Sequence, residues 1–177
     1  MIIVLNGPIN SGKTTLAKIL WEKIPNMAHV EVDKIREFID WMDNHPAWEI
    51  SYETSLKVVR EFVKKDLNVI ITYHISDEGY KQLAKELKDL DTDIYGFTLM
   101  PSIEKVLENR GTRKIDKREK EYIKDSYQRK LNRVTYGETI DNTNQTPQET
   151  AEYILSKINT KGNTNKSYSR RDKSLYL

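Results

Sequence analysis

The sequence predicts an α/β fold with three layers, in which a five-stranded parallel sheet carries helices on both faces. Two observations predict it. Short apolar runs rich in β-branched residues alternate with segments of helical spacing along most of the 177 residues. A glycine-rich turn also joins the first such run to the first helical segment. Alternating units of this kind form parallel strands linked by right-handed crossovers, and their ligands lie at the carboxyl ends of the strands.

The five expected strands are short and bounded by polar or turn-forming residues. They cover residues 2–5, 28–32, 69–73, 94–99 and 138–141. The expected helices have apolar residues three and four positions apart. They cover residues 14–24, 33–42, about 51–65, 77–90, 101–110, 116–131 and 147–158. Residues 43–49 are expected to be a break, after which Ser51 caps the next helix.

Residues 7–14 match the phosphate-binding pattern G-x-x-x-x-G-K-[ST] without interruption. Gly7 and Gly12 allow the backbone to curl so that several N–H groups face one concavity at a helix N-terminus. Lys13 is expected to reach the β- and γ-phosphates, and the Thr14 hydroxyl is the expected magnesium ligand. The remaining expected nucleotide contacts in this loop are Asn10, Ser11 and Thr15. The motif predicts a P-loop NTPase fold that binds ATP and Mg²⁺.

Composition excludes several other classes of protein. Hydrophobic residues make up 37% of the chain and charged residues 32%, and no apolar run is long enough to span a membrane. The chain has no cysteine, which excludes disulfides and thiolate zinc sites. Met1 leads directly into the first strand without a basic leader segment. These features favour a cytoplasmic enzyme.

The net charge of +2 is unevenly distributed. Residues 161–177 carry five basic residues and one acidic residue, so the first 160 residues have a net charge of −2. We therefore expect one kinase domain over residues 1–160, with a lid at about 110–133, and a flexible basic tail over 161–177. The tail leaves contact with nucleic acid open, but the body of the domain does not favour it.

Asp33 follows the second strand, where a carboxylate faces the γ-phosphate across the loop. It is suited to accept a proton from an attacking hydroxyl or to help hold magnesium, although it also suits the cap of its helix. Arg36 lies one turn later and is a candidate for binding the acceptor, the alternative being a solvated side chain. Arg110 and Arg113 flank a glycine before a charged helix, which is suited to closure over the phosphates.

The rest of the candidate site comes from polar and aromatic residues at strand ends. Asn142 and Asn144 follow the last strand and are candidates for contact with the base. Candidates for the acceptor pocket are Trp41, Trp48 and Tyr52, between the second and third strands, and Tyr73 and His74, at the end of the third strand. Packing is the alternative for each tryptophan. No Asp ends the third strand, as a standard Walker B motif requires, so magnesium is expected to depend on Thr14, water and Asp33.

The order of these motifs resembles the small P-loop kinases that have a nucleoside-monophosphate-kinase type of core. Within that group, residues 1–159 are similar to phosphotransferases that act on alcohols, including polynucleotide 5′-hydroxyl kinases, chloramphenicol phosphotransferase, gluconate and shikimate kinases and zeta toxins. Asp33-x-x-Arg36 resembles the Asp-x-x-Arg of polynucleotide kinases, which implies Asp33 as the base and Arg36 on the acceptor side. Arg110 and Arg113 resemble lid arginines of that group.

The prediction is an ATP- and Mg²⁺-dependent kinase that transfers the γ-phosphate to a hydroxyl of a small molecule. Lys13, Asp33, Arg110 and Arg113 are its expected catalytic residues. A nucleotide or nucleic-acid 5′-hydroxyl kinase is the alternative enzyme. A nucleotide-binding regulatory module with little transfer activity is the alternative of another class. The sequence names neither the acceptor nor the oligomeric state.

Overall fold

A computed structural model of the chain describes residues 1–109 and 114–158. Five parallel strands form one sheet in the order β2-β3-β1-β4-β5. They are β1 (Ile2–Asn6), β2 (Met27–Glu31), β3 (Asn68–Thr72), β4 (Ile94–Leu99) and β5 (Glu138–Ile140). All five coincide with the expected strands to within one residue at each end. The predicted parallel α/β fold is therefore confirmed.

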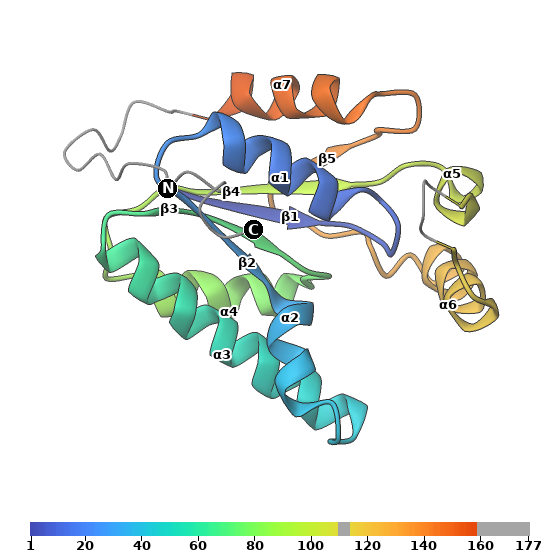
Figure 1. The fold of residues 1–177 in the computed structure, drawn as a ribbon, viewed down its shortest axis with the longest axis horizontal. Helices are drawn as coiled ribbons and strands as arrows, with labels where there is room; N and C mark the ends of the chain where they lie inside the picture. Colours follow the sequence, from blue (N-terminus) through green and yellow to red (C-terminus); the bar gives the residue numbers. More distant parts are fainter. Residues whose placement is uncertain (110–113, 159–177) are drawn as a thin grey trace, which may run out of the picture.

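Helices cover both faces of the sheet and make the three layers visible in Figure 1. Helices α1 (Lys13–Lys23) and α7 (Pro147–Lys157) lie on one face, and α3 (Asn44–Lys64) and α4 (Asp77–Leu87) lie on the other. Successive β1 side chains alternate between two cores: Ile3 packs toward α1 and α7, and Val4 toward α3 and α4. The strand is buried on both faces, which explains its uninterrupted apolar sequence.

The remaining short helices lie beyond the carboxyl ends of the strands. They are α2 (Val32–Arg36), the 3₁₀ helix η1 (Glu37–Ile39), α5 (Ile103–Leu107) and α6 (Lys117–Gln128). Val106, Ile115 and Ile123 form a small apolar cluster between α5 and α6, and Ile9 of the glycine-rich loop packs against it. The segment expected to be a lid is thus joined to the loop by apolar packing.

The expected break at residues 43–49 is wrong, because α3 begins at Asn44 and continues through this segment. Pro46 lies in the first turn, where a residue without an N–H group breaks no helical hydrogen bond. Ser51 caps nothing: it is buried in the interior of α3 and its Oγ donates to the Ala47 carbonyl at 2.6 Å. The single helix expected over 33–42 is replaced by the short α2 followed by η1.

Three other helices are shorter than expected. Helix α4 ends at Leu87, whereas the expected helix continues to residue 90. Helix α5 ends at Leu107, and its N-terminus is capped by Ser102, whose Oγ accepts from the Lys105 amide at 3.3 Å. Helix α6 ends at Gln128, and its N-terminus carries a capping box formed by Asp116 and Glu119. None of the helices in the two described ranges is both long and apolar enough to cross a membrane.

Candidate active site

The glycine-rich loop between β1 and α1 has the conformation that its sequence predicts. Gly7, Asn10 and Gly12 have φ angles of 141°, 63° and 100°, in the region that favours glycine and tolerates asparagine. At Gly7 a side chain is also sterically excluded, since a Cβ atom would lie 2.4 Å from the Leu99 carbonyl oxygen. The loop therefore wraps closely against the end of β4.

Lys13 and Thr14 begin α1 and face the loop's own groove. The Lys13 Nζ donates to the carbonyls of Gly7 and Pro8 at 2.8 and 2.9 Å, which holds the ammonium group across the mouth of the loop. The Thr14 Oγ1 donates to Glu31 Oε1 at 2.9 Å. A groove of about 210 Å³ runs along residues 9–15 and is closed on the far side by Glu31 and Asp33. Its size and its amides suit a chain of phosphates.

Glu31 is a candidate that sequence reasoning missed. It is the last residue of β2 and pairs in register with Thr72 of β3, the strand that lacks a Walker B acid. Its carboxylate contacts Thr14, so a hydroxyl and an acidic oxygen meet beside the phosphate groove. Its position in the sequence could have identified it, because Glu31 lies two residues before Asp33, at the end of a strand. In this fold that end of the strand lies close to the loop.

A second cavity, of about 300 Å³, lies on the opposite side of the loop, between α1 and the start of α7. Its lining combines apolar and amide side chains, as a nucleotide base requires: Ser11, Gly12, Thr15, Leu16, Leu99, Lys105, Asn142, Gln145, Pro147 and Thr150. The Asn142 Nδ2 donates to the Ser11 carbonyl at 3.1 Å, which ties this cavity to the loop. Asn144 is exposed and is not part of the lining.

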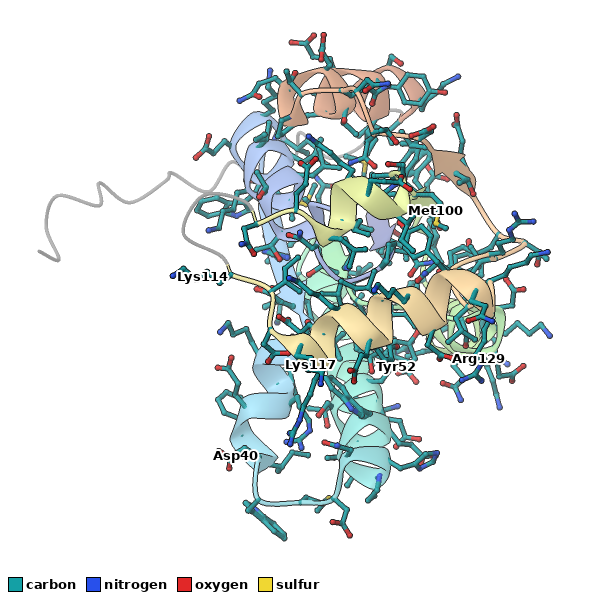
Figure 2. The ribbon with its side chains drawn as sticks, turned by 90° about the vertical axis from the view of Figure 1, so that its right-hand side faces the viewer. Asp40, Tyr52, Met100, Lys114, Lys117 and Arg129 are labelled. Atoms are coloured by element: carbon teal, nitrogen blue, oxygen red, sulfur yellow. The ribbon has the colours of Figure 1, made fainter. Side chains whose placement is uncertain are left out.

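A larger cavity, with a volume of about 570 Å³, opens beside Asp33 and Lys13. Three aromatic side chains from three elements form its walls: Trp48 of α3, Tyr73 after β3 and Tyr122 of α6. Gly7, Pro8, Ile9, His74, Glu119 and Asn132 complete the lining. In Figure 2 α6 lies across this end of the molecule, with α5 above it and α2 and α3 below. The cavity therefore lies where an acceptor could reach a γ-phosphate in the loop.

Burial shifts the titration of two groups in this cavity. The pKa of His74 is lowered by burial and by the positive charge of Lys13, while its hydrogen bond with the Asn132 side chain acts in the opposite direction. His74 is therefore neutral near pH 7. Burial, together with the negative charge of Asp33, raises the pKa of Tyr73 to about 12, which keeps its hydroxyl protonated. Both side chains can thus donate or accept hydrogen bonds without adding charge.

The sequence of residues 1–159 matches the family model for chloramphenicol phosphotransferase-like proteins. The chain belongs to this family. It is therefore a phosphotransferase of the kinase type, in agreement with the loop geometry. Among curated proteins, none matches the sequence.

Solved structures with the same fold include kinases and a resistance protein. The tunicamycin resistance protein of Deinococcus radiodurans superposes with a TM-score of 0.63 at 24% identity, over 88% of this chain and 94% of that one. A sugar kinase from Janibacter has a TM-score of 0.66 at 17% identity, over 88% and 92%. Shikimate kinase from Aquifex aeolicus has a TM-score of 0.58 at 19% identity, over 89% and 95%. At these identities the likeness concerns the fold.

Arg36, Trp41 and Tyr52, which were expected to bind the acceptor, do not line the large cavity. Arg36 donates to the carbonyls of Ile39 and Met42 at 2.8 and 3.2 Å, so its guanidinium holds the turn between η1 and α3. It also lies over the Trp48 ring, 5.7 Å from the centroid. Trp41 is 78% exposed and lies outside the lining. By contrast, Asp33, Tyr73 and His74 are brought together with Lys13.

Arg110 and Arg113 lie outside the described residues, as does the tail over 161–177. The structure does describe hydrogen bonds in the chain on either side of the expected lid. The Asn10 Nδ2 donates to the carbonyls of Val106 and Glu108 at 2.8 and 2.9 Å. On the far side of α6, Thr135 N donates to Asp77 Oδ1 at 2.7 Å and Tyr136 Oη donates to the Ile75 carbonyl at 2.7 Å.

Glu119, Tyr122 and Asn132 belong to the large cavity although no motif marks them. They come from the segment expected to be a lid. Glu119 and Tyr122 lie on α6, which crosses this end of the molecule (Figure 2), and Asn132 lies in the turn that follows it. The sequence indicates only that Glu119 and Tyr122 lie on the same face of α6, because they are three residues apart.

The oxygen atoms beside Thr14 fit a magnesium ion. A hydroxyl and two carboxylates, from Thr14, Glu31 and Asp33, line one end of the phosphate groove. Hard oxygen ligands of this kind, few in number and completed by water and phosphates, are typical of magnesium sites in kinases. In the described ranges no group of three or more His, Cys, Asp or Glu side chains is arranged for a metal ion of its own. The arrangement therefore suits a metal held jointly with a nucleotide.

Proposed function

We propose that this protein transfers the γ-phosphate of ATP to a hydroxyl group of a small molecule that binds in the 570 Å³ cavity. The observation that carries the proposal is the joint lining of that cavity by Lys13 of the phosphate loop and by Asp33. A phosphate donor and a general base then face the same space. Such an arrangement serves transfer to an acceptor better than hydrolysis, since the aromatic walls limit access of water.

The proposed roles follow from where each group lies. Backbone amides of the loop and the Lys13 ammonium hold the phosphates. Asp33 accepts the proton of the acceptor hydroxyl as its oxygen attacks the γ-phosphorus, and the bond from that phosphorus to the β-phosphate oxygen breaks. Thr14, Glu31 and Asp33 would hold magnesium, which supplies neutralisation of phosphate charge when bound. The cavity that Asn142 ties to the loop would take the base.

Arg110 and Arg113 remain proposed lid residues that neutralise charge on the transferred phosphoryl group. The hydrogen bonds of Asn10 to the carbonyls of Val106 and Glu108 support this proposal, because they fix the chain immediately before Arg110 against the phosphate loop. For Arg36, the bonds to Ile39 and Met42 favour a structural role. That placement disfavours the alternative of a nucleotide or nucleic-acid 5′-hydroxyl kinase, which Arg36 and the basic tail supported.

An acceptor screen with [γ-³²P]ATP tests the proposal. Phenicol antibiotics and tunicamycin enter the screen first, because the family is named for chloramphenicol phosphotransferase and one structural neighbour is a tunicamycin resistance protein. Sugars, shikimate, nucleosides and 5′-hydroxyl oligonucleotides complete it. We expect label on a small alcohol with the wild-type protein and none with Lys13→Ala. Release of phosphate without transfer to any acceptor would instead favour a regulatory nucleotide-binding module.

A further inference from the structure

The large cavity beside Asp33 adjoins a second, outer cavity of about 320 Å³. The two share Trp48, Tyr73 and His74 in their linings, so they meet along these side chains. The outer cavity lies between the first turns of α3 and the start of α4, and it does not include the phosphate loop. A molecule with its hydroxyl at Asp33 can therefore extend past Tyr73 into a separate compartment.

A row of aromatic rings connects the two compartments. Tyr73 packs against Trp48 with ring centroids 5.8 Å apart and stacks on Tyr52 at 5.7 Å. Tyr52 is held in place, since it is only 7% exposed and its Oη donates to the Gly79 carbonyl at 2.7 Å. Trp48 is 36% exposed, and the Arg36 guanidinium lies over its ring, 5.7 Å from the centroid, so the remaining exposed part of Trp48 is what the row presents to solvent. Rigid rings of this kind bind ligand faces at small entropic cost.

The outer cavity offers carboxylate and amide oxygens, which accept hydrogen bonds. Two carboxylates, Glu49 and Glu78, and the Gln82 amide belong to its lining. Its basic side chains are the imidazoles of His45 and His74, and none of its described lining residues is Lys or Arg. Glu78 contacts Lys81 at 3.6 Å, but both side chains are more than 70% exposed, so this ion pair is weak. Carboxylates next to aromatic faces favour an ammonium group over a neutral or anionic one.

We propose that the outer cavity is a second acceptor subsite, which takes the cationic, amine-bearing end of an elongated hydroxyl compound. The reacting hydroxyl lies in the inner cavity, and the body of the molecule packs along Trp48, Tyr73 and Tyr52. This inference rests on the proposed function, because it assumes that the inner cavity holds the acceptor. It goes further in naming where the rest of the acceptor binds and which charge it carries.

Three matched probes test the subsite. Each is 2-phenylethanol with a para four-carbon chain, which ends in an ammonium, a hydroxyl or a carboxylate group. Their affinity for the full chain is measured by isothermal titration calorimetry in the presence of Mg²⁺ and a non-hydrolysable ATP analogue. We expect the ammonium probe to bind about 3- to 10-fold more tightly than the hydroxyl probe, and the carboxylate probe to bind most weakly.

The double variant Glu49→Gln/Glu78→Gln should bring the three affinities to within about twofold of one another. The control Glu53→Gln/Glu152→Gln removes the same net charge from exposed positions outside both cavities and should keep the wild-type order. Equal affinities in the wild type, no binding of the ammonium probe, or the same loss in the control would overturn the subsite.

Mass spectrometry of the same probes after incubation with ATP separates this inference from the proposed function. Phosphorylated probes without a charge preference would refute the subsite and leave the kinase proposal intact. A charge-ordered affinity that depends on Glu49 and Glu78, with no acceptor phosphorylated in this assay or in the screen, would support the subsite and count against transfer.

Discussion

The hydrogen bonds of Asn10 predict a measurable coupling between the phosphate loop and the lid. Its Nδ2 donates to the Val106 carbonyl at 2.8 Å in a partly buried position and to the Glu108 carbonyl at 2.9 Å near the surface. Asn10 also has a φ of 63°, which alanine adopts at a cost and glycine adopts freely. Replacing it with each of these residues therefore separates the lost hydrogen bonds from the backbone strain.

The expected magnitudes follow from the geometry. Together the two bonds contribute about 1–2 kcal/mol to holding α5, since one is partly buried and the other is exposed. Asn10→Gly loses these bonds, and Asn10→Ala loses them and adds about 1 kcal/mol of backbone strain. A loss of 1–2 kcal/mol in local stability corresponds to hydrogen exchange that is about 5- to 30-fold faster.

Hydrogen exchange with mass spectrometry on the peptide that covers residues 101–109 measures this effect, and urea denaturation measures global stability. We expect both variants to exchange faster in this peptide and Asn10→Ala to be the less stable of the two. Asn142→Ala is the control: it loses a different bond to the loop, the 3.1 Å contact with the Ser11 carbonyl, and keeps both Asn10 bonds to the carbonyls of Val106 and Glu108. Wild-type exchange in Asn10→Gly would refute the coupling, and equal stability of the two Asn10 variants would refute the strain.

Three further predictions concern the loop and the cavity. Glu31→Gln should raise the Mg²⁺ concentration needed for tight binding of a fluorescent ATP analogue by about tenfold, because an oxygen beside Thr14 loses its charge; an unchanged requirement would remove Glu31 from the site. Gly7→Ala should weaken binding of the same analogue by more than about tenfold, since its Cβ would meet the Leu99 carbonyl at 2.4 Å, and wild-type affinity would contradict the loop geometry. The lowered pKa of His74 means that the unfolded chain takes up its proton first as the pH falls below 6.5, so stability should fall between about pH 7 and pH 5.5. In urea titrations His74→Gln should lose less stability than the wild type over this range. An equal loss in both would refute the lowered pKa of His74 as the cause.

The sequence predicted the sheet and the phosphate loop because both depend on local patterns. Buried strands need continuous apolar residues, and the loop needs glycine at fixed positions, so β1 and residues 7–14 could be read directly. The large cavity was predicted in part, through Asp33, Tyr73 and His74, which follow directly from strand ends. Their meeting with Lys13 is a consequence of parallel topology, which the alternation of elements already indicated.

The errors arose where tertiary contacts decide the outcome. The turn-forming residues at 43–49 suggested a break, but Asp43 and Pro46 suit the first turn of a helix as well as they suit a loop. Arg36 lies three residues after Asp33, where an arginine could bind the acceptor. Its N–H groups instead donate to backbone carbonyls in the turn after η1. Tyr122 and Asn132 come to the cavity through the packing of α6, which a charged helical pattern does not specify.

The most direct test of the central claim is single-turnover phosphoryl transfer by Asp33→Asn, with the acceptor that the screen identifies. The variant keeps the size of the side chain and removes its ability to accept the hydroxyl proton. We expect the transfer rate to fall by about 10²- to 10⁴-fold while the affinity for an ATP analogue, measured at saturating Mg²⁺ because Asp33 is also a proposed magnesium ligand, stays within about threefold of the wild type. Transfer at the wild-type rate would contradict the assignment of Asp33 as the base that faces the phosphate loop.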